Sequence, residues 1–224
     1  ETSKVAANLA GYVIEFNPAT NTFNPTPIMT INMNYAKGDV HTSVPAVNNW
    51  EAWANQWSDL HEGGSTSAGI RIMRPQPMLT SLEFTDNGDL VLGFADRTAF
   101  QTGYKQRSTV SGDNKTYNGY VGGDMLRARN ISGTWTLESN GSIGGQSGSG
   151  VGNGQGPGGG EFYSGEKYSN IHEETFMGGL IVVPGTNQTV AIVMDPLAVW
   201  TGGLAWMSNT DGALSKQYQV YEST

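Results

Sequence analysis

The feature that most constrains the fold is a repeat, because four short apolar segments separated by polar turns occur twice along this chain of 224 residues. The segments are residues 79–84, 90–94, 124–129 and 134–138 in the first unit, and 179–183, 190–194, 203–207 and 213–221 in the second. Asn-Gly at 87–88 and Asp-Gly at 211–212 indicate hairpin turns between such segments. A recurring unit of four antiparallel strands is typical of a β-propeller blade.

A partial unit precedes these two. Residues 12–16 and 22–31 are joined by Asn-Pro-Ala-Thr-Asn and match the third and fourth strands of a blade. Two and a half blades cannot close a ring of roughly 4–8 blades. We therefore predict an all-β fold in which residues 1–224 form one incomplete, propeller-like array of four-stranded antiparallel blades. Its parts are a half blade at 11–33, an insertion at 34–77, a blade at 78–139, a Gly-rich loop at 140–177 and a blade at 178–221.

The strand pattern also predicts which surfaces are covered. Alternation along the strands places one set of apolar side chains between blades: Leu82, Phe84, Leu92, Ile181, Val183, Ile192 and Trp206. The strand at 12–16 would lie at an open edge, and open edges are normally covered. We expect it to pair with other parts of a longer polypeptide or with a neighbouring chain.

The insertion contains a Trp-rich segment that predicts one short helix near 49–61. Asn49 can cap its start, and the Gly pair at 63–64 can end it. Trp50, Trp53 and Trp57 recur at helical spacing. Either these indoles pack onto the rim of the propeller, or Trp50 and Trp53 form a platform on which a sugar stacks. The second interpretation requires an exposed indole.

Composition excludes several classes of function. The chain has no Cys, so it has neither a disulfide nor a thiolate metal site. A net charge of −8 argues against nucleic acid and anionic membrane surfaces as partners. No apolar run approaches the ~20 residues of a membrane helix, so no membrane insertion is predicted. Only 14% of residues are charged. Together with many Gly, Asn, Ser and Thr residues, this favours an extracellular or cell-surface protein.

Long connections are expected on one face of the array and short ones on the other, and binding usually occurs on long loops. Polar side chains should converge on this long-loop face: Asp96, Arg97, Asp124, Glu161, His172, Glu173 and Asp195. The densest polar run also includes Glu166 and Glu174.

Three interpretations of these polar side chains stay open. They can be structural, because Asp96 and Asp195 follow equivalent strands and a repeated residue often fixes a repeated turn. They can bind a cation, with calcium as the candidate cofactor and Glu161, His172 and Glu173 as ligands. They can also form a two-carboxylate hydrolase site. The chain lacks the H-E-x-x-H and G-x-S-x-G motifs.

Several strings together carry a resemblance to a known family. They are YVIEFNPATNTF at 12–23, PQPMLT at 75–80, GDLVLGFADR at 88–97, GDMLRA at 123–128, GNGQGPGGGEFY at 152–163 and HEETFMGGL at 172–180. The chain resembles a propeller-like region of large bacterial cell-surface proteins that lies upstream of SdrD-like B-repeat or Ig-like modules. The resemblance implies export, a cell-surface location, and an adhesive or structural role.

The sequence therefore predicts a non-catalytic extracellular or cell-surface module for adhesion, ligand binding or surface assembly through the long-loop face. The long loops are rich in Gly, Ser and Asn, which suits adaptable recognition. A glycan or a surface protein is the expected partner. The alternative is a carbohydrate-active hydrolase with acidic residues around a central opening.

Overall fold

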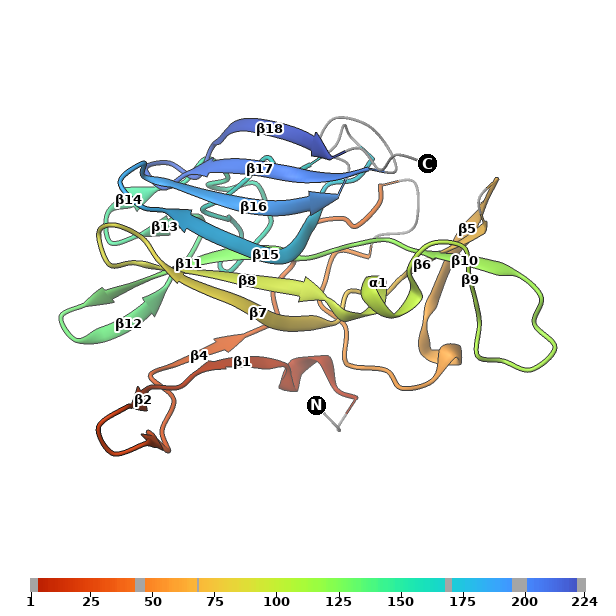
Figure 1. Ribbon diagram of the computed structural model, residues 1–224, viewed down its shortest axis with the longest axis horizontal. Coiled ribbons are helices and arrows are strands. Elements are labelled where there is room, and N and C mark those ends of the chain that lie inside the picture. The colour runs from red at the N-terminus through yellow and green to blue at the C-terminus, as the bar shows by residue number, and fades with distance from the viewer. Residues whose placement is uncertain (1–3, 43–46, 68, 168–170, 195–200, 221–224) are drawn as a thin grey trace.

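Each of the two predicted four-strand units forms one antiparallel sheet in the computed structural model (Figure 1), which describes residues 4–42, 47–67, 69–167, 171–194 and 201–220. The first unit gives β7 (Pro77–Phe84), β8 (Leu90–Asp96), β11 (Asp124–Ile131) and β12 (Thr134–Leu137). The second gives β15 (Phe176–Val183), β16 (Gln188–Met194), β17 (Gly202–Ser208) and β18 (Leu214–Val220). Strands make up 47% of the structure and helices 6%, which confirms a mostly β fold.

The partial unit forms a two-stranded layer against the first sheet. β1 (Ala10–Val13) pairs with β4 (Met29–Asn32), and the hairpin continues through β2 (Phe16–Asn17) and β3 (Thr22–Phe23). Among the described strands β1 has no second partner. Pairing of this edge with another chain or segment therefore stays a prediction.

The three sheets stack because β8 is apolar on both faces. All seven of its residues are buried. Leu92 and Phe94 belong to a core shared with Ile31 of β4, whereas Val91 belongs to a second core shared with β15 to β17. Gly93 allows the close approach of the third layer, since a Cβ at this position would lie 2.7 Å from Cζ of Phe176.

The outcome for the predicted buried residues is mixed. Leu92 is fully buried, but Leu82, Phe84, Ile181 and Ile192 are exposed. For Ile181 and Ile192 the reason is that no described layer covers the outer face of the β15–β18 sheet, so the prediction of burial between blades is wrong at these two positions. The described residues form no closed ring of sheets, and the propeller itself stays a prediction.

A smaller mixed sheet, not predicted, lies at one end of the stack (Figure 1). It contains β5 (His61–Thr66), β6 (Gly69–Met73), β10 (Thr116–Gly119) and β9 (Gln106–Arg107), with β6 and β10 parallel. The helix α1 (Arg97–Thr102) packs against β6 and β10. The remaining elements are η1 (Ala6–Asn8), η2 (Trp57–Asp59), β13 (Ser142–Ile143) and β14 (Gln146–Ser147). No helix of the described residues is long and apolar enough to cross a membrane.

The predicted helix near 49–61 is wrong, because the segment contains only the single 3-10 turn η2. The backbone of this segment donates hydrogen bonds to residues 75 and 76 instead of forming helical hydrogen bonds. Glu51 N–H donates to Pro75 O at 2.8 Å, and Ala54 N–H donates to Gln76 Oε1 at 2.7 Å. Trp50 packs in the core beside Phe94. Tertiary contacts thus override the helical spacing of the Trp residues.

Candidate functional site

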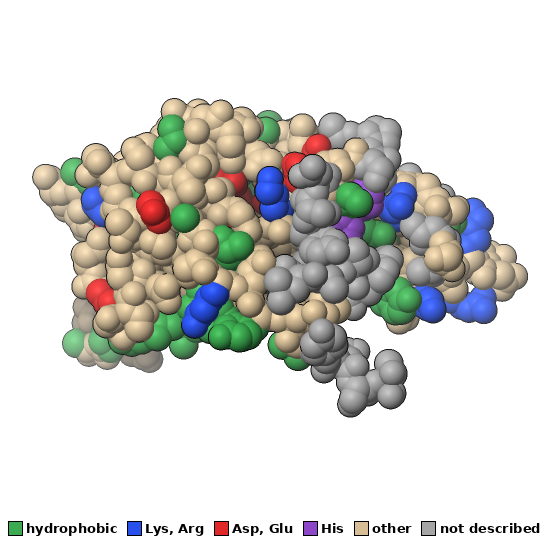
Figure 2. Space-filling model, turned by 90° about the horizontal axis from the view of Figure 1, so that it is seen from above, with side chains coloured by type: hydrophobic (Ala, Val, Ile, Leu, Met, Phe, Trp, Pro, Cys, Tyr) green, Lys and Arg blue, Asp and Glu red, His purple; other side chains and the backbone are tan. Residues whose placement is uncertain are grey.

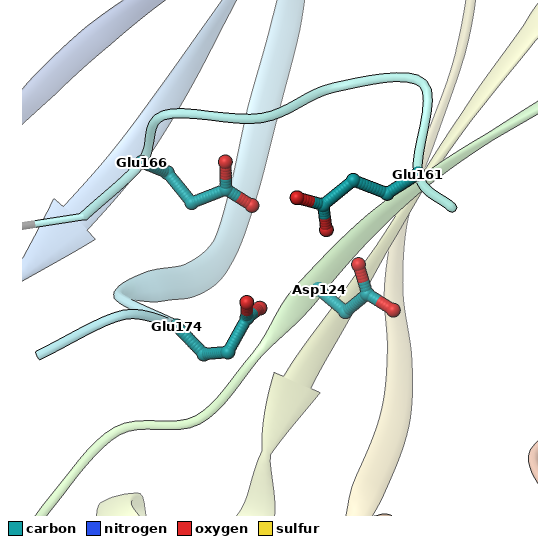
Figure 3. Close-up of side chains that lie close together, drawn as sticks. All are labelled: Asp124, Glu161, Glu166 and Glu174. Carbon is teal, nitrogen blue, oxygen red and sulfur yellow. The ribbon is translucent and has the colours of Figure 1, made fainter. Parts of the chain in front are cut away.

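Four acidic side chains from different parts of the chain meet at the junction of the layers (Figure 3). Asp124 opens β11, Glu161 and Glu166 lie in the loop before β15, and Glu174 stands two residues before β15. One oxygen from each carboxylate lies within 4.8 Å of the others. All four side chains are buried, none more than 3% exposed.

Packing and backbone contacts hold these four residues in place. Asp124 pairs with Phe94 at the end of the central sheet. Phe162 fills the second core directly after Glu161. The Gly-rich segment is held against the residues that follow β4, since Gly156 N–H donates to Ala36 O at 2.7 Å. The fold, and not sequence proximity, therefore brings the carboxylates together.

Few donors satisfy these carboxylates. Tyr35 Oη donates to Asp124 Oδ2 at 2.6 Å, and Asn153 Nδ2 donates to Glu161 Oε1 at 2.7 Å. Other oxygens of the group are buried and accept no hydrogen bond among the described residues: Asp124 Oδ1, Glu161 Oε2, Glu166 Oε1 and Oε2, and Glu174 Oε2. A buried acceptor without a donor costs about 1–3 kcal/mol.

The neighbouring acid Glu138 shows the contrast. Its side chain is also buried, yet its two oxygens accept hydrogen bonds from Arg127 N–H at 3.0 Å and Phe162 N–H at 3.2 Å. The four-carboxylate group therefore concentrates unsatisfied oxygens in one place, whereas Glu138 has a donor for each oxygen and Asp96 leaves only Oδ2 without one.

Burial makes ionisation of the group unfavourable when no counterion is bound. Desolvation raises the pKa of Asp124 to about 6 and that of Glu166 to about 7. The pKa values of Glu161 and Glu174 are raised well above the usual range, first by desolvation and then by charges that include the neighbouring carboxylates. The positive charge of Lys37 opposes this rise and lowers the pKa values of Asp124, Glu166 and Glu174.

The other predicted site residues lie elsewhere. Asp96 caps α1, accepting from Thr98 N–H at 2.9 Å and from Gln76 N–H at 3.1 Å. Arg97 donates to Ala54 O and lies over the ring of Trp53 at 4.9 Å.

The aromatic candidates have structural contacts. Trp50 is buried, with 2% exposure, and Trp53 is half-buried and donates its Nε1–H to Pro77 O at 2.9 Å. His172 packs against His41 and Tyr120, with ring centroids 5.1 and 5.3 Å apart.

Of the three predicted cation ligands, only Glu161 is in the group, joined by Asp124. Among the described residues, no oxygen of Glu173 joins them, and Asp195 lies outside those residues. Sequence reasoning placed Glu166 and Glu174 in the acidic run but did not name them as ligands, and it missed Lys37 altogether. No local pattern marks Lys37, because its relation to the acids depends on how the first layer packs.

Two grooves of the described surface are lined by residues other than the four acids. One of about 390 Å³ lies between β1 and β7 and is lined by apolar side chains that include Leu9, Leu79 and Phe94. Another, of about 470 Å³, is lined by Thr30, Asn32, residues 34–36, Leu137, Gly154 and residues 156–159. Seen from above, this face of the molecule shows only a few acidic side chains (Figure 2). The group resembles an internal ion site more than a substrate pocket.

Comparisons with known proteins give three relatives, all from the eukaryote Dictyostelium discoideum. Colossin-A is 31% identical over 216 residues, which cover 92% of this chain and 2% of colossin-A. Colossin-B is 25% identical over 98% of the chain and 5% of its own length, and colossin-C 24% identical over 96% and 19%. The chain thus spans a small part of the relatives it matches.

These comparisons correct the resemblance drawn from the sequence. The relatives are colossins, so the assignment to bacterial SdrD-like surface proteins is wrong. No protein-family model matches the chain, and no solved structure does.

Proposed function

We propose that this chain is a non-catalytic extracellular module that assembles face to face with another β-sheet. That sheet belongs either to a longer polypeptide that contains the chain or to a second molecule. The observation that carries the proposal is the exposed apolar outer face of the β15–β18 sheet, which we call the outer face.

The outer face is built from cross-strand rows of apolar side chains. Ile192, Leu204 and Tyr218 are paired in register across β16, β17 and β18. Ile181, Val190 and Trp206 form the neighbouring row, in which Val190 is buried and the Lys216 ammonium lies over the Trp206 ring. Ile181 and Tyr218 are each 56% exposed. Monomeric proteins rarely expose a contiguous apolar patch of this kind unless it is an interaction site.

The stack itself shows how such a face is covered. The central sheet buries one face under β1 and β4 and the other under β15 to β17. Packing of one sheet on another at about 10 Å spacing is the ordinary solution for two apolar faces. A further sheet on the outer face would repeat this arrangement, and in a longer polypeptide would continue a propeller-like array.

The composition supports the extracellular part of the proposal, because the chain is poor in charged residues and rich in Gly, Asn, Ser and Thr. A hydrolase is less favoured. A two-carboxylate mechanism needs a substrate between the acids, and the four converging carboxylates are each at most 3% exposed.

Sedimentation velocity over a range of protein concentrations tests the proposal. We expect the chain to self-associate when no other partner is present. Ile192→Lys should weaken association at least tenfold, whereas Val110→Lys, at a residue that is 50% exposed far from the sheet, should leave it unchanged. Wild-type protein that stays monomeric at its highest soluble concentration would contradict assembly. Glycan turnover that Glu161→Gln abolishes would favour the hydrolase.

A further inference from the structure

The four buried carboxylates surround a point that no hydrogen-bond donor of the described residues fills. The oxygens without partners include Asp124 Oδ1, Glu161 Oε2, both of Glu166 and Glu174 Oε2. The side chains point toward one another from the central sheet and the loop before β15 (Figure 3). We propose that this point binds one hard divalent cation, and that Ca²⁺ is the ion of best fit.

The second observation concerns Lys37, a buried ammonium that acts on the group through its charge but makes no hydrogen bond to it. Its side chain is 0% exposed, and its Nζ has no hydrogen-bond partner among the described residues. Its charge nevertheless acts on Asp124, Glu166 and Glu174. An ammonium that served as their direct counterion would form short charge-assisted hydrogen bonds with them. Lys37 forms no such bond and lies over the ring of Trp50, 5.2 Å from its centroid, so the carboxylate oxygens keep no direct counterion among the described residues.

The size of the oxygen cage is compatible with calcium. One oxygen from each acid lies within 4.8 Å of the others. Two oxygens on opposite sides of a bound Ca²⁺ are about 4.6–5.2 Å apart, whereas those around Mg²⁺ are about 4.0–4.2 Å apart. The four oxygens therefore fit within the span of a Ca²⁺ coordination sphere.

The donor chemistry and charge agree with this choice. All four donors are carboxylates, the ligand type that suits hard cations, and the group includes no His. Four carboxylates, the Lys37 ammonium and one Ca²⁺ leave a single negative charge. Without the ion, several like charges would be confined in a buried space, which is unfavourable.

Local backbone geometry supports a built cage. Gly38 has a φ of +101°, and a Cβ at this position would collide with Glu174 Oε1 and lie 2.8 Å from Cδ of Gln155. Asn153 holds Glu161 through the hydrogen bond at 2.7 Å. The absence of a side chain at residue 38 therefore lets Glu174 reach the group, and the Gly-rich segment covers it.

Calorimetric titration of Ca²⁺ into chelator-treated protein, together with thermal melts, tests the proposal. We expect one ion per chain and a rise in Tm of roughly 5–10 °C when the ion is in hundredfold excess over its Kd. Mg²⁺ should bind at least tenfold more weakly. Absence of both heat and a Tm rise in the folded wild type would overturn the proposal, as would binding of Mg²⁺ as tight as that of Ca²⁺.

Matched variants assign the ion to this group. Glu174→Gln should weaken Ca²⁺ binding at least tenfold, while the adjacent Glu173→Gln should not change it. The Tm without calcium should stay equal or rise in Glu174→Gln, because an amide removes buried negative charge. Should Glu174→Gln fail to fold, Glu166→Gln provides the same comparison. Equal loss of binding in Glu173→Gln would place the ion elsewhere.

Discussion

Asp89→Asn tests the ionic cluster that joins the second and third layers. Asp89 Oδ2 accepts hydrogen bonds from Arg127 Nε at 2.9 Å and Nη2 at 2.6 Å. Arg129 donates to both oxygens, at 2.7 and 2.6 Å. Arg127 is fully buried, and its Nη1 donates to Asn209 O in the turn before β18 at 2.6 Å. Removing the carboxylate would leave this buried guanidinium without its counterion.

The expected loss is large because breaking a buried ion pair costs about 3–5 kcal/mol. For a domain of this length the loss corresponds to roughly 6–20 °C in Tm. Urea denaturation at pH 7 measures it. Glu83→Gln, on the neighbouring strand β7, is the control and should change the free energy of unfolding by less than about 0.5 kcal/mol. A loss below about 1 kcal/mol in Asp89→Asn would refute the reasoning.

The same variant has a pH signature. Burial alone would raise the pKa of Asp89, but Arg129 and Arg127 overcome that effect and lower it below the usual value. A carboxylate whose pKa is lowered by folding stabilises the protein above its unfolded pKa of about 3.9, and this contribution is lost as the pH falls through the folded value. The difference between wild type and Asp89→Asn should therefore narrow below about pH 4, and a constant difference would contradict the assignment.

Three further changes test burial and close packing. Desolvation raises the pKa of Asp96 to about 7, so its ionisation costs stability as the pH rises from about 4 to 7. Asp96→Asn should flatten this part of the profile, by up to about 4 kcal/mol, in thermal melts between pH 4 and 8; parallel profiles would contradict it. Leu92→Ala should cost about 2–5 kcal/mol in urea denaturation, whereas its exposed cross-strand partner Leu82→Ala should cost less than about 1; equal losses would contradict the layer model. Gly93→Ala should cost about 1–3 kcal/mol because its Cβ meets Phe176. Gly202→Ala, with open space around it, should be neutral, and similar melts for both would contradict the close approach of the sheets.

The strands that the sequence predicted well are those set by local signals. The apolar run at 90–94 and the turn before it correspond to β8, and the run at 124–129 to β11. Period-two alternation and Gly-containing turns extend over only a few residues, so they can be recognised in a single sequence. The parallel pairing of β6 with β10 joins residues more than forty positions apart, and no local signal marks it.

The candidate site was only partly predictable for the same reason. The acidic run at 161–174 was visible, but which of its members point inward depends on the packing of Phe162 and Phe176 in the second core. For Trp50 and Trp53 the sequence predicted a helix that does not form. Their spacing is helical, yet Trp50 packs in the first core and Trp53 donates to Pro77 O, and the segment between them has no regular structure. Periodicity identifies an apolar face only when the segment has the assumed secondary structure.

The proposed ion site and the outer face are connected through β15, and this connection makes a final prediction. Glu174 stands two residues before β15, which carries Ile181 of the outer face. An ion that fixes Glu174 should therefore favour the arrangement of β15 that binds a partner. By linkage, calcium should strengthen self-association by the same factor by which association strengthens calcium binding. Sedimentation with calcium and with chelator measures the first effect. Glu174→Gln should lose the calcium dependence, whereas Ile192→Lys should lose association and still bind the ion. Wild-type association that is equal in calcium and in chelator would show that the two sites are independent.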